Sequence, residues 1–413
     1  MSNWGGVTVN GYGDSASIDA FARLRVSNPV TIFDSKQIFD NAPLFWDDQE
    51  VSGSGTTSTH STAEARTQLA VSNTTAGNRT RQTFMRHNYQ PGKSQLVFMT
   101  TRMSTGGTGI TAAVGLFDDD NGLFFINDEG TLKAVQRSNA TGSPVDTAIS
   151  QTSWNLDTMN GSGDSGVTID PSKTQILFID FEWLGVGRVR MGFVIDGLPV
   201  YCHEFLNTNN LSVVYMSTPN LPIRYELTND GTGAATTMDH ICSTVISEGG
   251  SQNNGLLFYK STEGTHIDCN TDNTLYALMG IRLKSTHLAA SILLERASIQ
   301  IQTASENAEW CWVWNPTVTG TFTYANITNS AVMVAVASGS GPTVSGGTTS
   351  TGGFAESTSG GGGSGGVTSP ISNARLLGSA IDGTVDELVL CYRPVGGSTN
   401  HDVEAGITWR ELV

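Results

Sequence analysis

The chain has 413 residues, 38% of them hydrophobic and 15% charged, and its 22 basic against 38 acidic side chains leave a formal net charge of −16. Such an acidic chain repels phosphate backbones and anionic lipid, which argues against a general role in binding nucleic acid or a membrane surface. Much of the remaining sequence is Gly, Ser, Thr and Asn, a composition typical of many short strands joined by turns.

Residues 1–30 are expected to form an N-terminal arm, because several glycines interrupt any regular pattern there. Within this arm, residues 19–26 (DAFARLRV) form a short amphipathic piece. We expect the arm to anchor the protein on a neighbouring subunit, with a flexible terminus as the alternative. The side chains predicted to dock are Phe21, Arg23, Leu24 and Arg25.

Neither a signal peptide nor a membrane span is expected. The first six residues lack both a basic and an apolar segment, and the longest apolar stretch, residues 331–337, is too short to cross a bilayer. The five cysteines lie far apart, so we expect buried free thiols made in a reducing cytoplasm, not a disulfide framework. They are Cys202, Cys242, Cys269, Cys311 and Cys391.

The first strong strand signals lie between residues 95 and 137. Residues 95–103 (QLVFMTTRM) are rich in β-forming side chains, and apolar runs follow at 112–117, 123–127 and 131–137, separated by Asn-Gly and Glu-Gly turns. The last three runs predict a three-stranded meander. No sustained 3.6-residue periodicity is present, so helix should be scarce. We therefore predict an all-β fold, a jelly-roll or lectin-like β-sandwich, with its main body at residues 31–303.

Residues 176–205 predict two successive hairpins. A two-residue turn at Asp196-Gly197 would set Ile195 opposite Leu198, and a three-residue loop at 185–187 would set Glu182 opposite Arg190. Both registers place the apolar side chains on one face, which we expect to be the core. The opposite, polar face would carry Asp180, Glu182, Arg188, Arg190, Tyr201 and His203.

Three interpretations of this polar face remain open. It could be a ladder of paired charges at the surface or an interface, where a cross-strand ion pair contributes only a fraction of a kcal/mol. It could bind carbohydrate through carboxylates, arginine and aromatic rings. It could also hold a catalytic carboxylate pair, because Asp180 and Glu182 would lie about 7 Å apart on one strand face.

The catalytic interpretation is the weakest of the three. A jelly-roll glycoside hydrolase strand would read Glu-x-Asp-x-x-Glu, whereas Phe178 stands where the first Glu is needed. A general acid needs a raised pKa, whereas an arginine opposite Glu182 would lower the pKa of that carboxyl group. We therefore predict that the protein is not an enzyme.

No metal or cofactor is predicted. Residues 118–120 (DDD) could bind Ca²⁺, but the bidentate Glu of an EF-hand loop is absent, and an acidic hairpin turn is the preferred interpretation. A zinc site built from two His-Cys pairs is disfavoured, because zinc sites show tighter Cys-rich spacing. Those residues are His240, Cys242, His266 and Cys269.

Residues 304–413 are expected to complete the same sandwich or to form a small second β-domain. Alternation places Trp310, Trp312 and Trp314 on one face, either as a core stripe or as an exposed aromatic platform. Residues 338–369 are a Gly/Ser/Thr-rich segment, which composition predicts to be a disordered linker. The alternative is a long loop that becomes ordered only against a partner.

Several motifs together resemble a poorly described family of tailed-bacteriophage virion structural proteins. They are residues 19–26 (DAFARLRV), 27–37 (SNPVTIFDSKQ), 181–193 (FEWLGVGRVRMGF), 203–205 (HEF), 386–393 (DELVLCYR) and 408–412 (TWREL). The resemblance implies a virion-associated, sandwich-like protein and carries over no catalytic residues.

The predicted function is therefore a structural component of a tailed-phage virion. It would attach to the tail, baseplate or capsid surface as a fibre, spike or decoration subunit, with host glycans as a further ligand. Expected partners are other virion proteins of the tail, baseplate, collar or capsid, and further copies of the chain, with a trimer favoured. The alternatives are a capsid-cementing protein without a ligand and a glycan depolymerase using Asp180 and Glu182.

Overall fold

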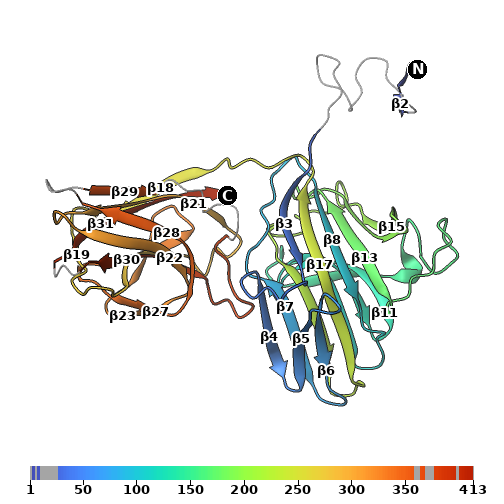
Figure 1. The fold of residues 1–413 in the computed structure, drawn as a ribbon. Helices are drawn as coiled ribbons and strands as arrows, with labels where there is room; N and C mark the ends of the chain where they lie inside the picture. Colours follow the sequence, from blue (N-terminus) through green and yellow to red (C-terminus); the bar gives the residue numbers. More distant parts are fainter. Residues whose placement is uncertain are drawn as a thin grey trace.

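In the computed structural model of the protein, residues 2–4, 7–9, 27–357, 363–367, 376–396 and 400–412 are described. Two bodies built of strands lie side by side, one coloured blue to yellow and the other orange to red (Figure 1). In this part of the chain the only helical turn is η1 (Gln151–Ser153). Among the described residues no helix is long and apolar enough to cross a membrane.

Little of the N-terminal arm is described. Two short strands, β1 (Ser2–Trp4) and β2 (Val7–Val9), pair with each other antiparallel. The predicted docking residues Phe21, Arg23, Leu24 and Arg25 lie outside the described residues. Their docking role therefore stays a prediction.

The first sandwich consists of two antiparallel sheets, here called sheets I and II. Across sheet I the order is β12 (Val145–Ser150), β11 (Thr131–Ser138), β10 (Gly122–Asp128), β9 (Ile110–Phe117), β16 (Ile223–Asn229), β7 (Gly77–Thr83) and β4 (Trp46–Gly53). Across sheet II it is β15 (Leu198–Phe205), β14 (Val189–Ile195), β13 (Thr174–Phe181), β8 (Gln95–Arg102), β17 (Thr236–Ser247), β6 (Arg66–Val71) and β5 (Thr56–Ser61), with β3 (Val30–Lys36) beside β17.

The chain crosses repeatedly between these two sheets, as it does in a jelly roll. Alternation along β8 places Val97 and Met99 inside, where they meet residues such as Val114 of sheet I in one continuous core. The predicted meander of β9, β10 and β11 is present. The prediction of an all-β, jelly-roll or lectin-like sandwich is confirmed.

The second sandwich also has two sheets, here called sheets III and IV. Sheet III contains β26 (Gly339–Ser340), β19 (Ile267–Asp268), β31 (Asp402–Leu412), β21 (Ser291–Ile301) and β29 (Gly363–Val367), with β18 (Leu256–Ser261) on β31. Sheet IV contains β23 (Thr317–Thr319), β27 (Thr343–Ser345), β20 (Tyr276–Leu283), β30 (Glu387–Val395), β22 (Asn307–Trp314) and β28 (Thr348–Glu356), with β25 (Val332–Val336) on β20 and β24 (Tyr324–Asn326) on β25.

These pairings correct the predicted domain boundary. The last strand of the first sandwich ends at Ser247 and the first strand of the second begins at Leu256, so the division lies between them and not at 303/304. Strands β20 and β21, which were assigned to the main sandwich, pair with β30 and β31 near the C-terminus. The boundary was misplaced because a local strand pattern predicts the position of a strand in the sequence but not the strand with which it pairs.

The Gly-rich segment 338–369 contains strands in its described part, so the disordered-linker prediction is wrong there. Strand β28 pairs along β22, where Gly352 lies opposite Cys311. A Cβ atom on Gly352 would approach the Trp310 carbonyl oxygen to 2.5 Å, so glycine is what lets the two strands come together.

The three tryptophans of β22 lie in the core of the second sandwich. Trp312 has no exposed surface, and Trp310 and Trp314 are also buried. Cys311 and Val313 point to the other face of sheet IV, in a separate small apolar cluster. The core-stripe interpretation is therefore right, and an exposed aromatic platform is ruled out.

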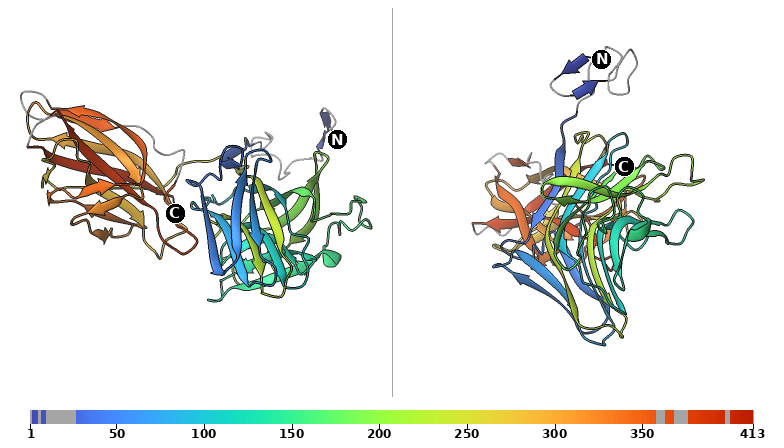
Figure 2. Two further views of the ribbon diagram at one scale, coloured as in Figure 1. Left: turned by 60° about the horizontal axis from the view of Figure 1, so that its bottom comes forward. Right: turned by 90° about the vertical axis from the view of Figure 1, so that its right-hand side faces the viewer.

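The two sandwiches touch through the segment 376–386, which reaches back to the first sandwich. The Ser379 amide donates to the Phe84 carbonyl oxygen at 3.0 Å, and the Ile381 amide donates to Asp47 Oδ2 at 2.7 Å. Leu376 packs against the core of the first sandwich. A second view shows the orange and red strands as a separate body beside the blue to yellow one (Figure 2, left).

Candidate binding surface on the first sandwich

The hairpin β13–β14 has a register two residues away from the predicted one. Asp180, not Glu182, lies opposite Arg190, and Phe181 lies opposite Val189, so the connecting loop is longer than predicted. Because the shift is an even number of residues, every side chain stays on its predicted face. The core face is confirmed by the buried side chains Leu177, Ile179, Phe181, Val189, Met191 and Phe193.

The hairpin β14–β15 begins in the predicted register and then departs from it. Ile195 pairs with Leu198 as predicted, but a bulge at Cys202 shifts the pairing so that Met191 lies opposite His203. A bulge inserts one residue and reverses the faces beyond it. His203 is therefore buried, with its ring edge-to-face on Phe205 at 4.6 Å and its Nδ1 accepting the Asn155 amide at 3.3 Å, and it does not belong to the polar face.

Three of the predicted residues do meet on the outer face of sheet II, the face turned away from the core. Arg190 forms an ion pair with Asp180, and the Tyr201 hydroxyl donates to Asp180 Oδ2 at 3.4 Å. The Arg190 guanidinium carbon lies 4.4 Å from the centre of the Tyr201 ring. Burial, followed by the nearby Asp180 charge, raises the pKa of Tyr201, so its hydroxyl stays protonated. Asp180 is only 7% exposed, whereas the Arg190 side chain is 33% exposed.

An apolar floor supports this triad. The Phe178 ring meets Tyr201 edge-to-face at 4.9 Å and lies 6.0 Å from Phe98 on the next strand. A Cβ atom on Gly192 would lie 2.7 Å from the tip of Phe178, so glycine makes room for that ring. The triad therefore sits in a fixed position, because packing and ion pairing both hold it.

Glu182 and Arg188 lie at the edge of this surface, in the exposed loop that joins β13 to β14. The Arg188 amide donates to Glu182 Oε1 at 3.3 Å, and the Arg188 side chain pairs with Glu204 at 3.6 Å. Asp180 and Glu182 thus have different surroundings: one carboxylate is buried against arginine, and the other is exposed in a loop.

Sequence reasoning missed a second acidic–basic network on the same outer face. Asp239 is buried and accepts hydrogen bonds from Arg66 at 2.7 Å, from Arg102 at 2.6 Å and from Gln68 at 2.9 Å. These side chains come from β17, β6 and β8, which lie far apart in the sequence. No spacing signal could have joined them, because strand pairing alone brings them together.

The outer face of sheet I also carries an arginine–aromatic cluster that was not predicted. Phe117 and Phe124 stack with ring centres 4.4 Å apart. The Arg224 guanidinium carbon lies 5.4 Å from the centre of the Phe117 ring. The Arg137 guanidinium carbon lies 5.0 Å from the centre of the Phe124 ring. The rings are buried beneath the two arginines, so they offer no open platform to a ligand.

The carboxylates of Asp118 and Asp119 are used within the protein. Asp118 Oδ1 accepts the amides of Asp120 and Asn121 at 2.9 and 2.8 Å, and its other oxygen pairs with Arg86. Asp119 pairs with Arg224 at 2.5 Å. The acidic hairpin turn, not a Ca²⁺ loop, is the interpretation that these contacts favour.

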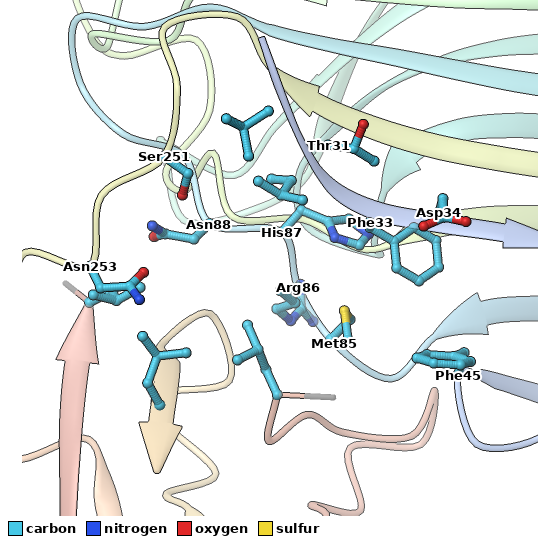
Figure 3. Close-up of a pocket in the computed structure, with 15 residues that line it drawn as sticks. Thr31, Phe33, Asp34, Phe45, Met85, Arg86, His87, Asn88, Ser251 and Asn253 are labelled. Carbon is cyan, nitrogen blue, oxygen red and sulfur yellow. The ribbon is translucent and has the colours of Figure 1, made fainter. Parts of the chain in front are cut away.

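A cavity of about 570 Å³ lies where the two sandwiches meet (Figure 3). It is lined by strand β3 and residues 85–88 of the first sandwich and by Leu293 and Leu412 of the second. The His87 ring lies against Phe33, with ring centres 4.8 Å apart. Burial lowers the pKa of His87 to about 3, so this histidine is neutral at physiological pH.

The two His-Cys pairs that were disfavoured as a zinc site are not brought together, because His240 and Cys242 belong to the first sandwich and His266 and Cys269 to the second. Another set, His266, Asp268 and Asp402, places ligand atoms within 4.8 Å of one another. All three side chains are at least partly exposed, and exposed acidic groups of this kind are common without an ion.

No family model and no curated protein matches this sequence. Similar solved structures include a Bacillus licheniformis β-glucanase, at 8% identity over 54% of this chain and 99% of that chain, with a TM-score of 0.34. The Emp47p carbohydrate recognition domain matches at 12% identity over 55% of this chain and 98% of that chain, with a TM-score of 0.34. A legume lectin-like domain from Entamoeba histolytica matches at 8% identity over 52% and 97%, with a TM-score of 0.30. Likenesses this distant say nothing about what this chain binds.

Proposed function

We propose that this protein is a non-enzymatic structural subunit of a larger particle, of the tailed-phage virion type that its motifs resemble. In this proposal the outer face of sheet II contacts host glycans. The observation that carries the binding role is the Asp180–Arg190–Tyr201 triad, a fixed set of polar groups on an open sheet face.

The chemistry of the triad suits a sugar. The partly exposed Arg190 guanidinium retains donors for hydroxyl or carboxylate oxygens, since it has five N–H groups. The Tyr201 ring lies against the Arg190 guanidinium and helps to hold this donor group in place. Because the side chains are already held in place, little conformational entropy is lost on binding.

The open shape of the surface implies weak binding at each site. A shallow contact of this kind would give a dissociation constant of about 1 mM, or roughly −4 kcal/mol. Repeating the site in a homo-oligomer, with a trimer proposed, would raise the overall avidity by about a hundredfold or more. Weak sites that are repeated on a multimeric particle suit a structural subunit better than they suit a monomeric receptor.

The binding role can be tested with the full chain on a glycan array, followed by titration of the best ligand. We expect Arg190→Lys to weaken binding about tenfold, because lysine keeps the charge beside Asp180 but loses the planar donor fork. Tyr201→Phe should cause a smaller loss, since it removes only the hydroxyl. Arg102→Lys, on the same face but in the Asp239 network, is the matched control and should bind as the unmodified protein does.

Two outcomes would overturn the proposal. Equal binding by the Arg190→Lys protein and its control would remove the triad from the site. Release of new reducing ends from a polysaccharide, lost in Asp180→Asn, would instead establish the depolymerase. Cryo-electron microscopy of the assembled particle tests the structural role: density on the capsid lattice with the triad covered would favour the cementing protein.

A further inference from the structure

Two of the five cysteines face each other across neighbouring strands of sheet IV. Cys311 of β22 lies directly opposite Cys391 of β30, so the two side chains are neighbours on one face of the sheet. Cys311 is 6% exposed and Cys391 is fully buried, within an apolar cluster that also contains Ala277, Val313 and Val389. Both thiols are free in this structure.

The backbone geometry at this position suits a covalent bond. Directly opposed residues in antiparallel strands have Cα atoms about 4.5–5.5 Å apart, whereas disulfides span about 4.4–6.8 Å. A bond between Cys311 and Cys391 would therefore need little backbone movement. Because the two strands lie next to each other inside sheet IV, with β20 on one side and β28 on the other, the bond would tie together the middle of the sheet.

The two thiols also differ in acidity in a way that favours reaction. The neighbouring Cys391 thiol lowers the pKa of the Cys311 thiol, whereas Cys311 and burial raise the pKa of Cys391. Burial raises the pKa of the other core cysteines, Cys202 and Cys269, which have no cysteine beside them. Since the thiolate is the attacking species, Cys311 is the more reactive of these groups.

We propose that Cys311 and Cys391 are a redox pair that forms a cross-strand disulfide once the protein meets an oxidant of the disulfide class, such as oxidised glutathione. The Cys311 thiolate attacks the oxidant's S–S bond and releases one glutathione thiolate. Cys391 then gives up its proton, attacks the Cys311 sulfur and releases the second. The two cysteines lose two electrons, and the oxidant is reduced to two thiols.

The consequence would be a second sandwich that becomes harder to unfold after leaving a reducing cytoplasm. A bond between residues so far apart in the sequence restricts the unfolded chain strongly. This inference is independent of the proposed glycan surface, because the cysteine pair lies in the other sandwich. Failure of one proposal therefore leaves the other unaffected.

The test uses the full chain, oxidised with glutathione disulfide both in the folded state and during refolding from denaturant. Free thiols are alkylated, the protein is digested without reductant, and the peptides are identified by mass spectrometry. We expect one linked pair containing Cys311 and Cys391, which separates on reduction, and free Cys202 and Cys269. The oxidised protein should melt about 5 °C or more above the reduced one.

Two variants complete the experiment. Cys391→Ser should abolish both the linked peptide and the difference in melting temperature, whereas Cys202→Ser, the control, should retain both. Recovery of Cys311 and Cys391 as free thiols under both oxidation regimes would overturn the proposal. So would linkage of either one to a different cysteine.

Discussion

Asp180 shows how a single residue acquires its partners from strand pairing. It sits opposite Arg190 on β14 and within reach of Tyr201 on β15, so three strands contribute one residue each to the triad. The carboxylate is buried, and a buried carboxylate is stable only when it is paired or hydrogen-bonded. The triad thus stabilises the sheet, and in the proposed function it also offers donors to a ligand.

Buried histidines give the protein a pH dependence at the residue scale. Burial lowers the pKa of His87 to about 3 and that of His203 to about 4, and it also lowers the pKa values of His240 and His401. In the unfolded chain a histidine titrates near 6.5, so below that pH the unfolded state binds more protons than the folded state. Stability from these groups is present above pH 6.5 and is lost as the pH falls towards 4 and 3.

We expect the free energy of unfolding to fall as the pH is lowered from 7.5 to 4.5, measured by urea denaturation at several pH values. His87→Gln should reduce the slope by up to about 1.4 kcal/mol per pH unit, because it removes one titrating group. His287→Gln, at an exposed position, should leave the slope unchanged. An unaltered slope in the His87→Gln protein would show that His87 is not buried as a neutral group.

At the scale of elements, β28 shows how composition can mislead. Its sequence TTSTGGFAE lies in a segment that resembles a flexible linker, yet it forms a full strand against β22. The glycines that suggest flexibility are needed for close pairing, because a side chain at Gly352 would collide with the Trp310 carbonyl oxygen. Glycine here marks a close backbone approach and not a disordered region.

Gly352→Val should therefore destabilise the second sandwich by about 2 kcal/mol or more, since a β-branched side chain cannot fit without moving β28. Thr349→Val, an exposed position on the same strand, should change stability by less than about 0.5 kcal/mol. Chemical denaturation followed by tryptophan fluorescence would report the difference, because Trp310 lies beside the substitution. Equal stability of the two variants would mean that β28 does not pair along β22.

At the scale of the whole molecule, the two sandwiches have separate cores but share a contact. Segment 376–386 belongs to the C-terminal part of the chain, yet Leu376 packs on the first core and the Ile381 amide binds Asp47. Interfaces of this kind between domains of one chain are often polar and permit relative motion. The contact limits that motion without merging the two cores.

Leu376→Glu should loosen this contact without unfolding either sandwich. We expect a larger radius of gyration by small-angle X-ray scattering and two resolved transitions by calorimetry, because a charge replaces an apolar contact. Leu256→Glu is the matched control, since Leu256 is already 65% exposed on β18. A radius identical to that of the control would show that the sandwiches are held together by other contacts.

The sequence by itself determined the all-β class, the meander, the core face of β13 and β14 and the placement of three tryptophans on one face of β22. All of these depend on the alternation of apolar and polar residues and on turn residues, which can be recognised within short stretches of sequence. An even error in register left the faces intact, so Asp180, Arg190 and Tyr201 were correctly placed together.

Only the tertiary structure decided the rest. The bulge at Cys202 moved His203 off the polar face, and the pairing of β20 and β21 with C-terminal strands moved the domain boundary. The Asp239 network and the Cys311–Cys391 pair join side chains that are far apart in the sequence. Their positions follow from long-range strand partners and register, which depend on how whole sheets pack and not on any local pattern.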